Sequence, residues 1–153
     1  MTMHIRPATN HDVPAIRKLV YGVLQEYGLE PDGTSADKDI EDIELYYQKS
    51  GGYFGLVEID GTLAATVGVY RRDPHTCELR KMYMLAPYRG HGYGKSLLEF
   101  SLEKARELGF KRMILETASP LKEAIALYEK YGFTEYLTEN LVTRCDKALE
   151  RSL

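Results

Sequence analysis

The hydrophobic residues in the first third of the chain change from strand-like to helix-like spacing. Residues 4–8 form a short strand candidate, and over residues 11–27 apolar side chains recur every three or four positions, which predicts an amphipathic helix. Asn10 stands at the position of a helix N-cap, and Gly28 stands where a helix of this length ends. A second apolar repeat predicts another helix over about residues 37–49.

Antiparallel strands are expected next. Residues 53–59 and 63–70 are rich in apolar and β-branched side chains and are separated by Asp60-Gly61, a dipeptide that favours the tight turn of a β-hairpin. Residues 77–85 predict a third strand of the same meander. The charged positions of the helix that precedes these strands are expected to face solvent; they are Lys38, Asp39, Glu41 and Asp42.

The second half of the chain predicts a strand, a glycine-rich turn and a long helix that ends at Gly109. A buried strand at residues 112–117, a helix that ends at Gly132 and strand segments at residues 133–137 and 141–149 follow. The resulting order, β-α-α-β-β-β-α-β-α-β-β, predicts an α/β fold. Its mixed sheet is antiparallel at first and then contains one right-handed βαβ crossover.

Composition narrows the class of protein. The 153 residues, of which 44% are hydrophobic and 28% charged, are enough for one domain spanning residues 1–153 and exclude a disordered chain. A net charge of −3 lacks the basic excess of a nucleic-acid binder, so we expect no nucleic-acid partner. No apolar stretch approaches the roughly 18 residues of a membrane span, and the N-terminus has no signal-peptide core, so we expect a cytoplasmic protein with no membrane contact.

Cysteine and histidine positions favour neither disulfide nor metal chemistry. Cys77 and Cys145 are too few for a disulfide framework and are expected to be reduced thiols, with a single bridge as the weaker alternative. His4, His11 and His75 have no companion at metal-ligand spacing, so no metal site is expected.

The segment RGHGYGKS, residues 89–96, is the most informative part of the chain. Its alternating glycines let the backbone turn sharply and approach a ligand closely. The helix that follows presents unpaired N–H groups and its positive dipole end to an anion. Since Arg89 and Lys95 add positive charge, the segment predicts a binding site for phosphate.

Two common phosphate motifs do not match this segment. A P-loop requires glycine at the position of Arg89, which excludes a nucleotide hydrolase of that type. The dinucleotide fingerprint requires G-x-G-x-x-G in the first βαβ unit, whereas the spacing here is G-x-G-x-G after three antiparallel strands. The pattern that does fit is R-G-x-G-x-G.

With this turn, the chain resembles the GNAT family of acetyl-CoA-dependent N-acetyltransferases. The resemblance spans nearly the whole chain and rests on IRPATNHDVPAI, CELRKMYML, RGHGYG and ALYEKYGF. It implies the GNAT fold, with a mixed central sheet and about four helices, and an enzyme that uses acetyl-CoA as cosubstrate.

The resemblance also implies which residues hold acetyl-CoA. The strand before the turn is bulged in the family, its free backbone groups pair with the pantetheine arm, and the N–H of Met84 would polarise the thioester carbonyl. Many members carry Asn where this chain has Leu121, so that hydrogen bond must come from Thr117 or Ser119 or be absent. The implied cofactor residues are Met82, Tyr83, Met84, Arg89, Gly90, His91, Gly92, Tyr93, Gly94, Lys95 and Ser96.

Acetyl transfer to an amine needs a proton acceptor and a proton donor. A lysine-like amine is only about 0.04% free base at pH 7, a penalty of roughly 4.6 kcal/mol. Glu78 resembles the glutamate that the histone-acetylating branch uses as base, and it also fits a strand glutamate in a salt bridge with Arg80. Tyr128 matches the family tyrosine that protonates the departing thiolate, and it also lies on an apolar face suited to core packing. We therefore predict Glu78 and Tyr128 as catalytic residues.

The acceptor is the least defined part of the prediction. No cysteine stands in a recognisable nucleophile setting, which favours direct transfer in a ternary complex over an acetyl-enzyme. The compact chain favours a small-molecule or amino-acid-like amine, and the resemblance implies that the first two predicted helices and the loop at residues 28–37 form one wall of its site. A protein lysine or N-terminus, or a catalytically idle coenzyme A-binding regulator, are the alternatives. Dimers are common in the family, so a homodimer is also compatible with the sequence.

Overall fold

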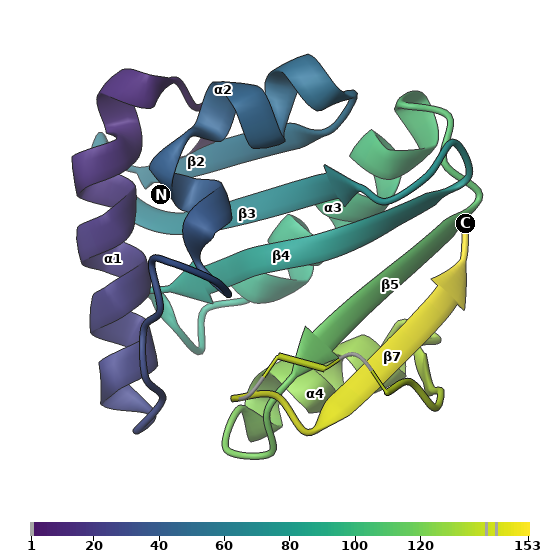
Figure 1. The fold of residues 1–153 in the computed structure, drawn as a ribbon. Coiled ribbons are helices and arrows are strands. Elements are labelled where there is room, and N and C mark those ends of the chain that lie inside the picture. Colours follow the sequence, from purple (N-terminus) through teal and green to yellow (C-terminus); the bar gives the residue numbers. More distant parts are fainter. Residues whose placement is uncertain (1, 140, 143) are drawn as a thin grey trace.

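A mixed seven-stranded sheet lies at the centre of the computed structural model, which describes residues 2–139, 141–142 and 144–153 (Figure 1). The first four strands pair antiparallel and the fourth and fifth pair parallel, which confirms the predicted meander and crossover. Across the sheet the strands are β1 (Met3–Pro7), β2 (Tyr53–Ile59), β3 (Thr62–Arg71), β4 (Thr76–Met84), β5 (Arg112–Thr117), β7 (Lys147–Ser152) and β6 (Thr134–Glu135).

Helices cover both faces of the sheet (Figure 1). On one face lie α1 (Val13–Glu26) and the short α2 (Ile43–Tyr46), whose core includes Ile16, Val20 and Phe54. On the other lie α3 (Tyr93–Glu107) and α4 (Lys122–Lys130), whose core includes Leu98 and Met113. Each helix thus buries its apolar side against the sheet. Among the described residues, no helix is long and apolar enough to cross a membrane.

The predicted single helix over residues 37–49 is wrong. The segment forms a 3₁₀ turn at Lys38–Glu41, then α2, then a second 3₁₀ turn at Gln48–Ser50. The break falls at Asp42, which has an extended φ of −147° and whose carboxylate accepts a hydrogen bond from the Leu45 N–H. Asp39, predicted to face solvent, is only 3% exposed because it turns inward to buried partners.

The predicted cap of α1 is also wrong. The chain enters this helix through a 3₁₀ turn at Asn10–Asp12, where the Asp12 carboxylate accepts the Thr9 N–H at 2.9 Å. The side chain of Asn10 instead donates to Asp42.

The last strand begins later than predicted. Cys145 N–H bonds to the Val142 carbonyl at 2.9 Å, so the chain is still turning there, and β7 starts at Lys147. Position 143 of the predicted strand segment, and position 140 just before it, lie outside the described residues.

A fork opens between β4 and β5. The two strands pair only over Thr76–Glu78 and Arg112–Ile114, and beyond this point they diverge (Figure 1). Next to the fork, β4 carries a bulge, because the register to β3 shifts between Thr66 and Gly68. Lys81 occupies the bulge with a left-handed φ of 54°, and its carbonyl accepts the Thr66 hydroxyl at 2.6 Å. A bulged β4, implied by the resemblance, is therefore present.

Candidate active site

Two cavities meet at the fork. The fork cavity, about 240 Å³, lies between the diverging strands, and the turn cavity, about 600 Å³, lies beside the glycine-rich turn. Four residues line both of them: Met82, Tyr83, Leu121 and Ala124. A molecule in one cavity can therefore touch a molecule in the other.

The turn cavity gathers about half of the predicted cofactor residues. Met82, Tyr83 and Met84 of β4 line it together with Arg89, Gly90 and Gly94. The remaining predicted residues stand at the start of α3 without lining the cavity; they are His91, Gly92, Tyr93, Lys95 and Ser96.

Backbone conformation at the turn explains its glycines. Gly90 and Gly92 have φ values of 79° and 85°, in the left-handed region that costs other residues about 1–2 kcal/mol. Gly92 is the N-cap of α3 and contributes no side chain that could occupy the first N–H groups of this 15-residue helix. Those groups are consequently available to an anion.

Arg89 is held at the mouth of the turn cavity by contacts from two elements. Its Nε donates to the Met84 carbonyl at 2.8 Å, and its guanidinium pairs with Glu26 near the end of α1. The guanidinium also lies over the Tyr27 ring, 5.2 Å from its centre. No local motif marks Glu26 or Tyr27 in the sequence, because their partner lies more than 60 residues away.

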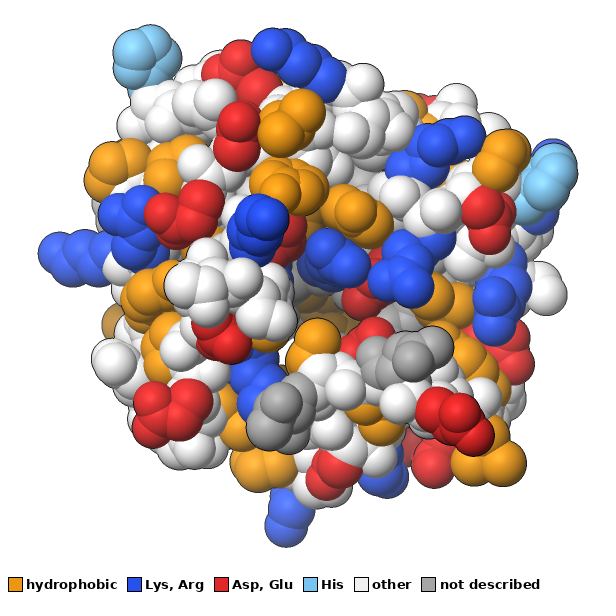
Figure 2. Space-filling view, in the orientation of Figure 1, with side chains coloured by type: hydrophobic (Ala, Val, Ile, Leu, Met, Phe, Trp, Pro, Cys, Tyr) orange, Lys and Arg blue, Asp and Glu red, His pale blue; other side chains and the backbone are white. Residues whose placement is uncertain are grey.

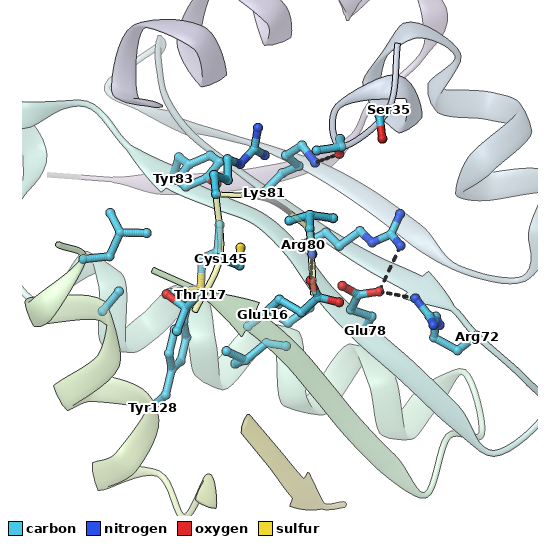
Figure 3. Close-up of a pocket in the computed structure, with 18 residues that line it drawn as sticks. Ser35, Arg72, Glu78, Arg80, Lys81, Tyr83, Glu116, Thr117, Tyr128 and Cys145 are labelled. Atoms are coloured by element: carbon cyan, nitrogen blue, oxygen red, sulfur yellow. Dashed lines mark hydrogen bonds and ion pairs between the residues drawn. The ribbon is translucent and has the colours of Figure 1, made fainter. Parts of the chain in front are cut away.

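Tyr128 of α4 lies in the wall of the fork cavity and is 6% exposed (Figure 3). Its ring packs edge-on against Phe133, with ring centres 5.7 Å apart. Burial raises the pKa of the Tyr128 hydroxyl well above its usual range, and burial raises the pKa of the nearby Tyr83 to about 12. Both hydroxyls therefore stay protonated near neutral pH and can donate hydrogen bonds.

Glu78 is buried at the point where the fork opens and is held by two arginines. Its Oε1 pairs with Arg72 Nη1 and with Arg80 Nη2, each at 2.9 Å (Figure 3). Arg80 is also stacked on the Tyr70 ring, 3.8 Å from its centre. The salt bridge to Arg80, one of the two interpretations of Glu78 left open by the sequence, is present.

A second carboxylate in the fork cavity was not predicted. Glu116 of β5 lines the cavity, and its Oε1 accepts the Val142 N–H at 3.0 Å. Within the described part of the chain, no Lys, Arg or His side chain lies within ion-pair distance of it. Its signal in the sequence is a lone carboxylate inside the buried strand RMILET.

A buried cluster of charges lies behind the fork and was also missed. Lys81 Nζ is 3.2 Å from Asp37 Oδ1 and 3.1 Å from Asp39 Oδ1, and Arg144 donates two hydrogen bonds to Asp37 at 2.6 and 2.5 Å. Burial alone would raise the pKa of Asp37, but the hydrogen bonds from Arg144 and the charge of Lys81 outweigh it and hold this pKa below its usual value. The cluster joins the 32–37 loop to the bulge of β4 and to the segment before β7.

Leu121 cannot make the hydrogen bond that Asn makes in many family members, and Thr117 and Ser119 are the two candidates to replace it. The two residues lie in different places. Thr117 is 4% exposed and lines the fork cavity. Ser119 lies outside both cavities, and its hydroxyl donates to Asp146. Of the two, only Thr117 therefore faces a space in which a ligand could bind.

Comparisons with known proteins agree on one family. Residues 18–133 match the acetyltransferase (GNAT) family. An uncharacterized N-acetyltransferase of Escherichia coli K12, YjgM, is 41% identical over 134 residues, which cover 84% of this chain and 80% of that protein.

Solved structures share the fold. A GNAT-family acetyltransferase from Staphylococcus aureus Mu50 superimposes with a TM-score of 0.90, at 23% identity and with 99% of each chain covered. A putative acetyltransferase from Salmonella typhimurium, yncA, determined with its cofactor acetyl-CoA, has a TM-score of 0.74 at 20% identity, covering 99% of this chain and 94% of that one.

Proposed function

Because the chain belongs to the GNAT acetyltransferase family and is an N-acetyltransferase, we propose that it acetylates the primary amine of a small-molecule or amino-acid-like acceptor. We further propose direct transfer from acetyl-CoA within a ternary complex. The observation that carries the proposal is the junction of the two cavities at Met82, Tyr83, Leu121 and Ala124, which leaves room for a cosubstrate on one side and an acceptor on the other.

The groups that line the turn cavity suit acetyl-CoA. The bulge of β4 interrupts the ladder to β3, which suits pairing of backbone groups at Met82–Met84 with the amides of a pantetheine arm. The start of α3, with Gly90 and Gly92 in left-handed conformations, suits the pyrophosphate, and Arg89, whose guanidinium pairs with Glu26, lines the same cavity. Bound acetyl-CoA would supply an activated acetyl thioester to this junction.

In this proposal Met84 N–H donates a hydrogen bond to the thioester oxygen and Tyr128 donates its proton to the departing sulfur. The place of Tyr128 in the wall of the fork cavity supports this role. Its raised pKa keeps the hydroxyl protonated near neutral pH but also makes it a weaker acid, so proton transfer requires that burial raise the pKa of the departing thiol as well. The raised pKa of Cys145, about 11 because of burial, argues against a thiolate nucleophile in the fork cavity and thus supports direct transfer. Glu78 stays a predicted base, although its Oε1 already pairs with two guanidiniums.

Calorimetric titration with acetyl-CoA, with ATP and NAD as controls, tests the cofactor part of the proposal. We expect micromolar acetyl-CoA binding and none for the controls. Thiol release with a panel of small amines and peptides then tests the acceptor. Faster turnover of a peptide than of every small amine would favour acetylation of proteins, and cofactor binding with no turnover of any amine would favour a regulator. The cytoplasmic location and the homodimer remain predictions.

A further inference from the structure

Positive charge is left over at one end of the fork cavity. Arg72 and Arg80 share the single oxygen Glu78 Oε1, so the three side chains carry a net positive charge (Figure 3). A guanidinium has five N–H donors, and one carboxylate oxygen cannot occupy those of both. In the described residues, neither arginine pairs with another carboxylate. This end of the cavity is therefore suited to an anionic group.

The other cations of the cavity are already neutralised. Lys81 lies between Asp37 and Asp39, and Arg144 forms a two-pronged pair with Asp37. The excess is thus confined to Arg72 and Arg80. Arg80 is further fixed by its stacking on Tyr70, which holds the guanidinium ready for planar, two-pronged recognition of a carboxylate.

Negative charge stands across the fork, on β5. Glu78 is aligned with Ile114 across the parallel pair, and Glu116 is two residues further along β5, on the same face of the sheet. At about 3.3 Å per residue, Glu116 lies roughly 7 Å beyond Ile114, level with Arg80, which is two residues beyond Glu78 on the parallel strand β4. Glu116 has no cationic partner among the described residues and can accept an ammonium group.

The size of the cavity limits the acceptor. Its volume of about 240 Å³ is below the roughly 300–1,000 Å³ of pockets for drug-sized ligands. Figure 2 shows Lys and Arg side chains gathered around a hollow near the middle of this face of the molecule. A small molecule with a carboxylate at one end and an amine at the other matches both the size and the charge of the cavity.

On the premise of the proposed function, we propose that the acceptor is a free amino acid or a similarly small amino carboxylate. Its carboxylate binds to Arg72 and Arg80, and its ammonium group binds to Glu116. These three residues then determine specificity, because an uncharged end group would leave the arginines without their anion.

A comparison of matched acceptors tests the substrate class. Each amino acid is assayed beside its amide and its decarboxylated amine, with acetyl-CoA saturating and thiol release as readout. We expect kcat/KM for the best amino carboxylates to exceed that for the matched amines by about tenfold to hundredfold, the range for a lost charged hydrogen bond. Equal or faster turnover of amides, decarboxylated amines or peptides would overturn the proposal while leaving acetyl transfer intact.

Three variants test which arginines bind the carboxylate of the acceptor. Arg72→Gln and Arg80→Gln should reduce the preference for the acid over its decarboxylated amine by about tenfold or more, mainly through KM. Arg71→Gln is the matched control, since it removes the same charge from an exposed neighbour that lines neither cavity. Arg72 has 44% of its side chain exposed, so its variant is expected to fold even where the Arg80 variant does not. An unchanged preference in folded Arg72→Gln would contradict the assignment.

A binding measurement separates this inference from the proposed function. Calorimetry of the best amino carboxylate with the protein–coenzyme A complex should give binding that Glu116→Gln and Arg72→Gln both weaken. Absence of acetyl-CoA binding to the wild-type protein would overturn the proposed function as well. Acetyl-CoA binding and turnover, without any preference for a carboxylate, would overturn only the inference.

Discussion

The hydroxyl of Tyr128 combines burial with a place in the wall of the fork cavity. Tyr128→Phe removes this hydroxyl and keeps the ring against Phe133, so we expect little change in stability. The loss of a general acid is expected to lower kcat by about 10²-fold, with KM for acetyl-CoA nearly unchanged. Steady-state thiol-release kinetics measures both constants, and a wild-type kcat would exclude Tyr128 from proton transfer.

A substitution at Gly92 tests the predicted anion site, and Gly109, just beyond the other end of α3, provides the control. Gly92→Glu places a carboxylate at the start of α3 and forces a left-handed φ, whereas Gly109→Glu imposes the same strain at the other end of α3. Each substitution is expected to cost about 1–2 kcal/mol of stability. Only Gly92→Glu should weaken acetyl-CoA binding, by tenfold or more, because only there would the new charge oppose the pyrophosphate at its proposed site. Equal affinities of the two variants in calorimetric titration would contradict the predicted phosphate site.

At the scale of elements, the pair between Asp37 and Arg144 joins the 32–37 loop to the segment before β7. Asp37→Asn leaves Lys81 and Arg144 with less negative charge in a buried place, so we expect a loss of about 3–5 kcal/mol at pH 7. The folded-state pKa of Asp37 lies below its unfolded value, so the stabilisation is complete above about pH 4 and is lost as the pH falls through the folded-state pKa. Urea unfolding at pH 7 and at pH 3.5 checks this.

The gap between wild type and Asp37→Asn should narrow at the lower pH, because the Asp37 carboxylate is then partly protonated in the unfolded wild-type chain, which favours unfolding. A gap that stays constant across this range would mean that the ionisation of Asp37 does not contribute to stability. Asp32→Asn is the control, since Asp32 is exposed in the same loop and has no cationic partner in the described residues.

How far the elements could be predicted depends on the range of the interactions that form them. The hairpin at Asp60-Gly61, the turn at residues 89–96 and α3 follow from local spacing, and the structure contains them. The segment 37–49 has a helical apolar pattern, yet Asp39 turns inward to Lys81, which is 42 positions away and invisible to a local pattern. The same limit hid Glu116 and the Asp37–Arg144 pair from the predicted site.

At the scale of the whole molecule, a ligand in the turn cavity should stabilise the complete fold, because the cavity joins α1, β4, the start of α3 and α4. Acetyl-CoA at a hundred times its Kd adds about 2.7 kcal/mol to the free energy of unfolding. For a chain of this length, we expect Tm to rise by roughly 5–11 °C. Thermal melts with acetyl-CoA and with ATP measure this, and identical shifts for both would contradict selective binding.

The three residue pairs between β4 and β5 are a short seam between two half-sheets, β1–β4 on one side and β5 to β7 on the other. Beyond this seam, β4 and β5 do not bond to each other, so an amide-rich chain lying in the gap can act as an additional strand. The pantetheine arm of acetyl-CoA is such a chain. Binding of the cosubstrate would therefore fill the gap in the sheet between β4 and β5. Amide hydrogen exchange at Met82–Met84 should slow when it binds.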